Sequence, residues 1–282
     1  MVTDGDARER VRRLAASAAG ASVSDAARLA DRLRGPQQTL GATYRRLAGG
    51  APGADRPAME WLLDNYYVVE RTFRLVREEF PQAFERRLPR SATGELAGFP
   101  EAYALAREIV TAGAHHVDVE TIARLAAEFQ KLRPLSMAEV WALPVLLRIV
   151  LLESLASAVA IALAVEGPAG DTLSDQIVTA CIRSLRTLET TDWKAFFEQV
   201  SETERILRED PAGVYARMDF DTRDRYRKVV EELAARSVWS EEAIAREVVR
   251  RSLEDTGGRG RHVGYHLIDD GFEALGLSLI HI

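Results

Sequence analysis

Three adjacent residues, Asp219-Phe220-Asp221, form the pattern with which many glycosyltransferases hold a metal ion and a sugar diphosphate. That chemistry requires both carboxylates at a strand end facing a nucleotide pocket, where Mg²⁺ or Mn²⁺ bridges to phosphate oxygens. Here the two acids precede a predicted helix, whose first backbone N–H groups have no partners and favour a carboxylate. The pattern therefore favours helix capping over metal binding.

Histidines occur in two places where metal binding deserves testing. His115-His116 are followed by Asp118 and Glu120, but adjacent histidines point in different directions, and no spacing here brings two ligands to one helix face. His262 and His266 lie four residues apart and can share a helix face, although no acid or thiol adjoins them. We predict a solvated loop at the first pair and no metal site at either.

No nucleophile is indicated. Cys181 is the only cysteine, which excludes an intrachain disulfide, and it lies in an apolar helical run typical of a small core residue. A catalytic thiol needs an activating base, and the sequence nearby supplies none. The glycine-containing stretches, Gly257–Gly260 included, match neither a phosphate-binding loop nor a dinucleotide fingerprint. We therefore predict no catalytic, cofactor-binding or metal-binding residue in this chain.

One cluster of basic residues could grip an anionic partner such as phospholipid headgroups. The cluster, with Tyr226 beside it, is Arg223, Arg225, Arg227 and Lys228. Acidic residues alternate with it at helical spacings, namely Asp221, Asp224, Glu231 and Glu232. Because opposite charges at these spacings pair along a helix surface, a solvated and internally paired face is favoured.

Arg148 stands in the centre of the most apolar segment of the chain. A buried guanidinium requires an acidic partner or backbone carbonyls, because its desolvation is otherwise uncompensated. We predict an ion pair between Arg148 and an acid on a neighbouring helix.

The elements that position these residues are predicted to be helices nearly throughout. Apolar residues recur at steps of three and four from Met59 to Phe80, which predicts an amphipathic helix that Pro81 ends. A helix is also predicted over 100–111 and another over 171–190. Capping residues mark further helix starts at Asp118, Ser136, Ser201, Asp210, Asp221 and Ser240. The helix that follows Ser136 is apolar on almost every side, which is typical of the central element of a bundle.

The predicted fold is all-α, an irregular multi-helix bundle with a weakly ordered helical N-terminal arm. Residues 1–56 are rich in Ala, Arg and Gly and end in GGAPGAD, which predicts a variable arm and linker. Residues 57–276 form the main helical module. No run of alternating polarity is long enough to predict a sheet, and no internal period indicates a solenoid.

The composition and charge of the chain argue against nucleic-acid binding, secretion and a membrane span. A hydrophobic content of 47% with 28% charged residues is typical of a soluble globular protein. The net charge of −6 argues against a nucleic-acid partner. The polar N-terminus lacks the apolar core of a signal peptide, which predicts a cytoplasmic environment. The most apolar window, Met137–Val165, contains charged residues and a proline, so we expect no membrane span.

Four stretches combine residues in an unusual way. They are EWLLDNYYVVER (60–71), the stretch 88–155 containing LAGFPEAYALAREIV and PLSMAEVWALPVLLRIVLLESL, DPAGVYARMDFDTRDRYRKVVEELA (210–234) and HVGYHLID (262–269). In this order they resemble the N-terminal region of cyclic β-1,2-glucan synthases, very large bacterial inner-membrane enzymes. The resemblance spans roughly residues 57–274, and none of its segments is a catalytic motif.

The resemblance implies a parent enzyme that uses UDP-glucose and a divalent metal to build and cyclise a protein-linked glucan. It implies transmembrane and transferase domains in the remainder of the same polypeptide as partners, and a location on the cytoplasmic side of the inner membrane. Because neither domain is present in this chain, we expect a truncated fragment that is soluble and non-catalytic, needs no cofactor of its own, and packs against or regulates the transferase region. The alternative is a stand-alone helical interaction or scaffold protein.

The last six residues, 277–282 (LSLIHI), resemble a laboratory sequence. The DNA string CTG TCT CTT ATA CAC ATC encodes them and looks like a transposon end used in sequencing libraries. We therefore interpret this segment as a sequencing-adapter artefact and exclude it from fold reasoning. The alternative is an apolar C-terminal tail that docks on the bundle.

Overall fold

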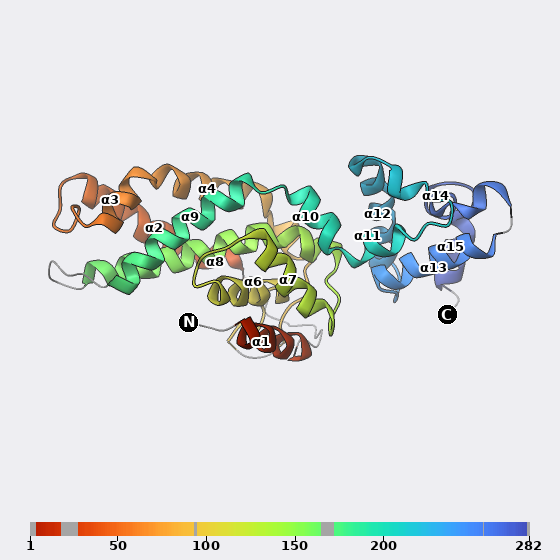
Figure 1. Cartoon of the computed structure of the whole chain (residues 1–282), viewed down its shortest axis with the longest axis horizontal. Coiled ribbons are helices and arrows are strands. Elements are labelled where there is room, and N and C mark those ends of the chain that lie inside the picture. The colour runs from red at the N-terminus through yellow and green to blue at the C-terminus, as the bar shows by residue number, and fades with distance from the viewer. Residues whose placement is uncertain (1–3, 18–27, 93–94, 165–171, 256, 281–282) are drawn as a thin grey trace. The chain divides into compact units, whose positions relative to one another are not determined.

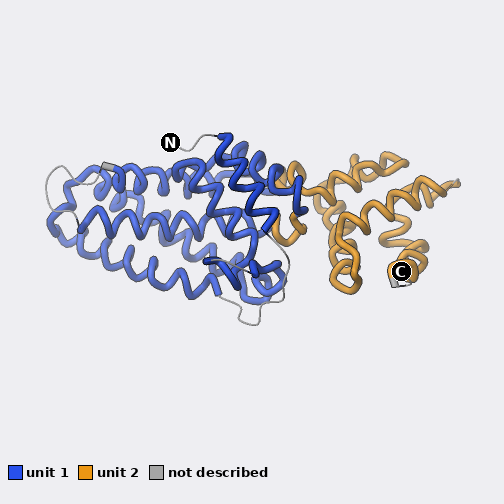
Figure 2. The backbone as a smooth tube through the Cα atoms, turned by 90° about the horizontal axis from the view of Figure 1, so that it is seen from below, with its two compact units in different colours: residues 1–134, 141–193 blue, residues 135–140, 194–282 orange. Residues whose placement is uncertain are grey.

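The computed structural model describes residues 4–17, 28–92, 95–164, 172–255 and 257–280. Within these ranges the fold is all-α, as predicted, and an isolated bridge between Arg90 and Pro100 is the only β pairing (Figure 1). The chain forms two compact units (Figure 2): unit 1 comprises residues 1–134 and 141–193, and unit 2 comprises residues 135–140 and 194–282.

Unit 1 contains most of the long helices. They are α1 (Asp4–Ser17), α2 (Leu29–Ala48), α3 (Pro57–Asp64), α4 (Tyr66–Glu79), α5 (Gln82–Glu85), α6 (Glu101–Ala112), α7 (Val119–Gln130), most of α8 (Met137–Ala164) and α9 (Thr172–Thr190). Unit 2 is built mainly from shorter helices, and its main segment begins at Lys194, the second residue of α10. They are α10 (Trp193–Val200), α11 (Glu202–Leu207), the 3₁₀ helix η1 (Tyr215–Arg217), α12 (Phe220–Ala235), α13 (Glu241–Glu254), η2 (Gly258–Arg261), α14 (Val263–Ile268) and α15 (Phe272–Ile280).

The units do not follow the predicted division at residue 56. The described part of the predicted arm forms α1 and α2, and both pack within unit 1: Val11 and Leu40 are fully buried. Arg12 of α1 also donates two hydrogen bonds to Glu128 of α7. The apolar faces of α1 and α2 are buried, so the described part of the arm belongs to the bundle. The alanine-rich composition alone did not reveal this burial.

The predicted helix from Met59 to Phe80 is interrupted at Asn65. Its apolar stripe is buried as expected, but α3 ends at Asp64 and α4 begins at Tyr66. The Asn65 side chain donates to the Trp61 carbonyl oxygen, 2.8 Å away. The Asn65 backbone N–H donates to the same oxygen at 3.2 Å, so the helical contact is kept at the residue between α3 and α4.

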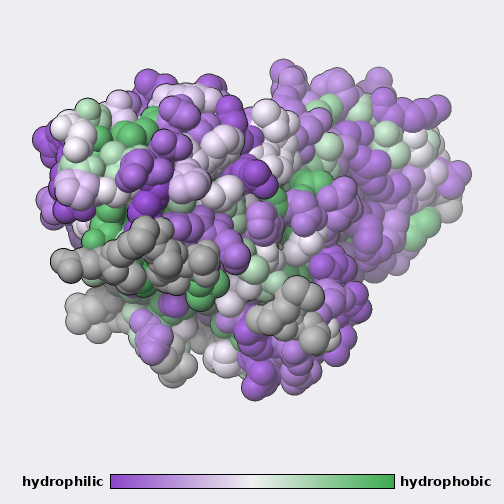
Figure 3. Space-filling view, turned by 60° about the vertical axis from the view of Figure 1, so that its left-hand side comes forward, coloured by the Kyte–Doolittle hydropathy of each residue, from purple (hydrophilic) through white to green (hydrophobic). Residues whose placement is uncertain are grey.

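The central position predicted for the apolar helix is confirmed by α8, in which every residue from Ala142 to Leu152 is buried. By length and composition α8 could cross a membrane, with a mean hydropathy of 2.1 in its most apolar window. However, 72% of that window is buried within the protein, and a core helix has the same composition. The face shown in Figure 3 is largely hydrophilic, with hydrophobic residues in small areas between hydrophilic ones.

Residues 277–280 of the LSLIHI segment continue α15, and Leu279 is buried. Residues 281 and 282 lie outside the described residues. An apolar stretch is expected to extend a helix whatever its origin. The interpretation as an adapter therefore stays a prediction.

Candidate functional site: buried polar clusters and two pockets

The Asp219-Phe220-Asp221 pattern caps a helix, with Asp219 as the cap in place of the predicted Asp221. The Asp219 carboxylate accepts from the Thr222 backbone N–H at 2.9 Å and from the Thr222 hydroxyl at 2.7 Å. Asp221 lies in the first turn of α12 and pairs with Lys194 at the surface. Asp219 therefore caps α12 through both carboxylate oxygens, and Asp221 faces solvent. That neither residue binds a metal stays a prediction.

The histidines are separated in the fold. Among the described residues no group of three or more His, Cys, Asp or Glu is placed to hold a metal ion. His116 is exposed, as predicted for a solvated loop, but His115 is half-buried and lines a cavity. His266 contacts the Gly260 carbonyl at 2.9 Å, whereas His262 contacts Asp210, so the two do not act together.

The prediction of a solvated basic face on α12 is correct for Arg225 and Lys228 and wrong for Arg223 and Arg227. Arg225 is exposed, and Lys228 pairs with Asp224 at 2.8 Å. The side chain of Arg227 is only 1% exposed, and Arg223 is also buried. Glu204 of α11 pairs with both arginines, and Arg223 also donates to Glu198 of α10. These partners lie on other helices and therefore could not be found from the spacing within one helix.

Glu204 is the centre of a buried ionic cluster in unit 2. Arg227 Nη1 donates to Glu204 Oε2 at 2.6 Å, and the Tyr215 hydroxyl donates to the same oxygen at 2.7 Å. Arg208 Nε donates to Oε1 at 2.7 Å, and Arg223 Nε lies 3.3 Å from that oxygen. The Arg227 guanidinium also stacks over the rings of Phe197 and Phe220.

Electrostatics keep the Glu204 carboxylate ionised. Burial raises its pKa, but hydrogen bonds from Tyr215 and Arg227 and the charge of Arg227 outweigh burial, so the net pKa is lowered. Conversely, burial and the adjacent carboxylate raise the pKa of Tyr215. With both oxygens fully engaged, Glu204 has no capacity left for acid–base chemistry, and the cluster joins α11, η1 and α12.

Asp210 does not start a helix as predicted. Its side chain is fully buried, and its carboxylate accepts from the backbone N–H groups of Val214, Tyr215 and Val263 at 2.9 to 3.0 Å. His262 Nδ1 lies 2.9 Å from the same carboxylate. Although burial acts to raise its pKa, these contacts lower the pKa of Asp210 to about 2.

The Asp210–His262 pair resembles the orienting half of a catalytic triad. The other ring nitrogen of His262, Nε2, lies 3.4 Å from the Tyr226 hydroxyl. Tyr226 is buried and burial raises its pKa, which opposes its use as a nucleophile. Next to the pair is a pocket of about 310 Å³, also lined by Arg259 and Asp269.

Gly264 leaves room for the His262 ring and the Tyr226 hydroxyl to lie close to the backbone of α14. A Cβ atom at position 264 would lie 2.5 Å from His262 Nε2 and 2.7 Å from the Tyr226 hydroxyl, closer than non-bonded atoms approach. The stretches 210–234 and 262–269, which carry part of the resemblance described above, thus supply the buried polar contacts that hold the loop before η1 against α12 and α14.

The predicted ion pair of Arg148 is confirmed. Its Nη1 donates to Glu79 of α4 at 2.6 Å, and its Nη2 lies 3.4 Å from the Leu188 carbonyl of α9. The Arg148 side chain is 7% exposed, whereas that of Glu79 is 45% exposed. Cys181 is fully buried, and burial raises its pKa to about 12, so it is a core thiol as predicted.

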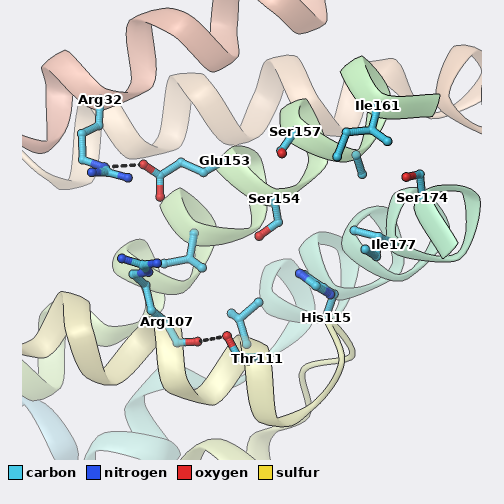
Figure 4. A pocket seen from close by; sticks show the side chains of 13 residues that line it. Arg32, Arg107, Thr111, His115, Glu153, Ser154, Ser157, Ile161, Ser174 and Ile177 are labelled. Carbon is cyan, nitrogen blue, oxygen red and sulfur yellow. Dashed lines mark hydrogen bonds and ion pairs between the residues drawn. The ribbon is translucent and has the colours of Figure 1, made fainter. Parts of the chain in front are cut away.

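Unit 1 contains a second polar pocket, with a cavity of about 410 Å³ (Figure 4). Its walls come from α2, α6, α8, α9 and the loop after α6. Arg32 donates to Glu153 at 2.6 Å on one side. Figure 4 shows Ser154 and His115 facing the same space, with Arg107 and Thr111 at its edge. His115 is prominent in the sequence beside His116, whereas Arg107 of α6 and Glu153 of α8 join it only through the packing of the helices.

Comparison with known proteins relates this chain to a glucan synthase. No model of a known protein family matches the chain. The chain is similar to the cyclic β-(1,2)-glucan synthase NdvB of Rhizobium meliloti, with 29% identity across 71% of this chain. The predicted resemblance to cyclic β-1,2-glucan synthases is confirmed. The matched region covers 10% of NdvB, so this chain spans a small part of the length of its relative.

Proposed function

We propose that this chain is a non-catalytic helical module of a membrane-bound cyclic β-1,2-glucan synthase, and that it packs against or regulates the transferase region. The observation that carries the proposal is the 29% identity to NdvB over 71% of the chain. The parent enzyme would transfer glucose from UDP-glucose with the help of a divalent metal, on the cytoplasmic side of the bacterial inner membrane.

The contacts in unit 2 support a structural role. A glucosyl transferase needs carboxylates that are free to hold a metal–nucleotide complex or to accept a proton. Here Glu204 receives hydrogen bonds from three side chains, and Asp210 receives three from backbone N–H groups. These acids hold helices together, which is what a packing module requires.

Deleting the matched region from NdvB tests the proposal. In Rhizobium meliloti cells without their own NdvB, the deleted enzyme is expected to make less cyclic glucan than the complete enzyme, at equal membrane abundance. A chimera that carries this chain at the same position is expected to restore part of the synthesis. Unchanged synthesis by the deletion would show that the region is dispensable for glucan production.

The isolated chain provides a second test. Incubated with UDP-glucose and Mg²⁺ or Mn²⁺, it is expected to transfer no glucose and to bind no nucleotide sugar. Transfer or binding that Asp219→Asn abolishes would assign the nucleotide site to this chain and would refute the non-catalytic role.

A further inference from the structure

The polar pocket of unit 1 has the composition of a ligand site. Its volume of about 410 Å³ lies within the range of about 300–1,000 Å³ that is typical of small-molecule sites. Apolar side chains of α8 and α9, including Ile161 and Ile177, form part of its wall. The polar part of the wall consists of hydroxyl, imidazole and guanidinium groups and the Glu153 carboxylate, which is unusual for a gap between packed helices.

The charges in this pocket leave one cation without a partner. Glu153 accepts from Arg32 at 2.6 Å and from the Tyr103 hydroxyl, so the carboxylate and the Arg32 guanidinium compensate each other. No carboxylate pairs with the Arg107 guanidinium among the described residues. Among the described residues that line the pocket, one positive charge is therefore uncompensated, which suits a ligand with a single anionic group.

The neutral polar groups offer both donors and acceptors. Burial lowers the pKa of His115, and a hydrogen bond to the Ala114 backbone offsets this only in part, so the imidazole is neutral near pH 7. The hydroxyls of Ser154 and Ser157 face the same cavity. Groups that both donate and accept match ligand hydroxyls, whereas a purely cationic pocket would match a bare anion.

The backbone beneath His115 is held in an uncommon conformation. Ala114 and His115 have φ values of 48° and 68°, in the left-handed region that is uncommon for residues other than Gly, although Asn, Asp and His are enriched there. The buried Ser184 hydroxyl fixes this loop, since it donates to the His115 carbonyl at 2.7 Å and accepts from Val117 N–H at 2.9 Å. Glycine at position 115 would adopt this conformation without strain, and histidine instead places an imidazole in the pocket.

We infer that this pocket binds an anionic monosaccharide, a hexose bearing one phosphate or carboxylate group. Arg107 pairs with the anionic group. His115, Ser154 and Ser157 bind the sugar hydroxyls, and Ile161 and Ile177 contact the apolar face of the ring. The inference does not depend on the proposed function, because it concerns this chain alone and its test needs no glucan synthesis.

Isothermal titration calorimetry on the full chain tests the inference with four probes. Glucose 6-phosphate and glucuronate represent the two anionic groups, while glucose and inorganic phosphate each supply half of the ligand. At least one anionic sugar is expected to bind with a Kd below about 1 mM, and each half alone to bind at least tenfold more weakly. The preferred anionic sugar tells phosphate from carboxylate.

Three variants connect binding to the pocket. Arg107→Gln is expected to weaken binding about tenfold or more, because it removes a charge-assisted contact. His115→Gly is expected to weaken binding while the melting temperature is unchanged or raised, since the substitution relieves the backbone. The matched control is Arg46→Gln, which removes an exposed arginine of α2 outside the pocket and is expected to change neither quantity.

Several results would overturn the inference. They are no heat of binding with either anionic sugar at about 10 mM, equal affinity for inorganic phosphate or glucose, and an unchanged Kd in Arg107→Gln. A misfolded Arg107→Gln protein cannot imitate the expected result, because His115→Gly tests the same pocket while preserving stability.

Discussion

Glu241, the first residue of α13, is buried where its carboxylate is poorly solvated. One oxygen accepts from the Met137 backbone N–H at 2.7 Å, and the whole residue is 8% exposed. Burial raises its pKa to about 7, the Met137 N–H opposes this rise, and the neighbouring acids Glu231, Glu242 and Glu139 add to it. The folded protein therefore keeps a proton on Glu241 at a pH at which an unfolded chain has released it.

The direction of the pH dependence follows from this difference. Between the ordinary value of 4.5 and about 7, the folded state binds more protons than the unfolded state, so the free energy of unfolding falls as the pH rises. At 1.36 kcal/mol per pH unit, the loss reaches about 3 kcal/mol above pH 7. In Glu241→Gln the amide oxygen can still accept from Met137, but the titration is gone. The preference of a helix start for an acid, about 0.5 kcal/mol, does not reverse the sign.

We expect Glu241→Gln to stabilise unit 2 by about 2–3 kcal/mol near pH 8 and to have little effect near pH 4. Because the chain has two compact units, a single global transition is a poor readout, and hydrogen exchange of the α13 amides reports on the relevant region. The control Glu232→Gln removes an exposed acid of α12 and should change exchange at neither pH. Equal or faster exchange in Glu241→Gln than in the parent near pH 8 would show that titration of Glu241 does not lower the stability of unit 2.

Three further predictions concern buried charged groups. Glu79→Ala should lower the melting temperature more than Arg148→Met does. The first substitution leaves a buried guanidinium without a carboxylate, whereas the second leaves a half-exposed carboxylate in water. Equal losses of melting temperature in the two variants would contradict this prediction. Glu204→Gln should destabilise unit 2 by about 3–5 kcal/mol in urea unfolding, since Arg227 stays buried with its charge uncompensated, and a loss below about 1 kcal/mol would argue that solvent reaches the cluster. The pKa of Asp210 is lowered from 3.8 to about 2, so its ionised carboxylate contributes about 2 kcal/mol to the free energy of unfolding above pH 4, and this contribution is lost as the pH falls through 2. Acid unfolding of Asp210→Asn should lack this loss, and an acid profile identical to that of the parent would exclude the contribution.

Local sequence patterns predicted most of the fold correctly. Asp118 and Ser240 cap α7 and α13 through side-chain contacts to backbone N–H groups three residues ahead. The box at Ser136 is closed in both directions by Glu139. Such caps depend on residues within one turn, so their spacing in the sequence specifies the geometry.

The second predicted capping box shows where local reasoning stops. Ser201 accepts from the Glu204 N–H as expected, at 3.3 Å. However, the Glu204 carboxylate does not return to the Ser201 N–H, and binds Tyr215 and Arg227 instead. The carboxylate is drawn into the core because its partners lie there, and this depends on where α12 packs.

From the amino-acid sequence alone we could predict the helical class, most helix starts, the buried position of α8, the need of Arg148 for a partner, and the resemblance to glucan synthases. These follow from periodicity, capping and burial, which act over a few residues. The packing of the helices was needed to show that Glu79 is that partner, that His262 contacts Asp210, and that Arg107 and His115 line one pocket. Contacts between residues far apart in the chain depend on how helices pack, and packing is specified by the sum of many weak interactions that no single spacing reveals.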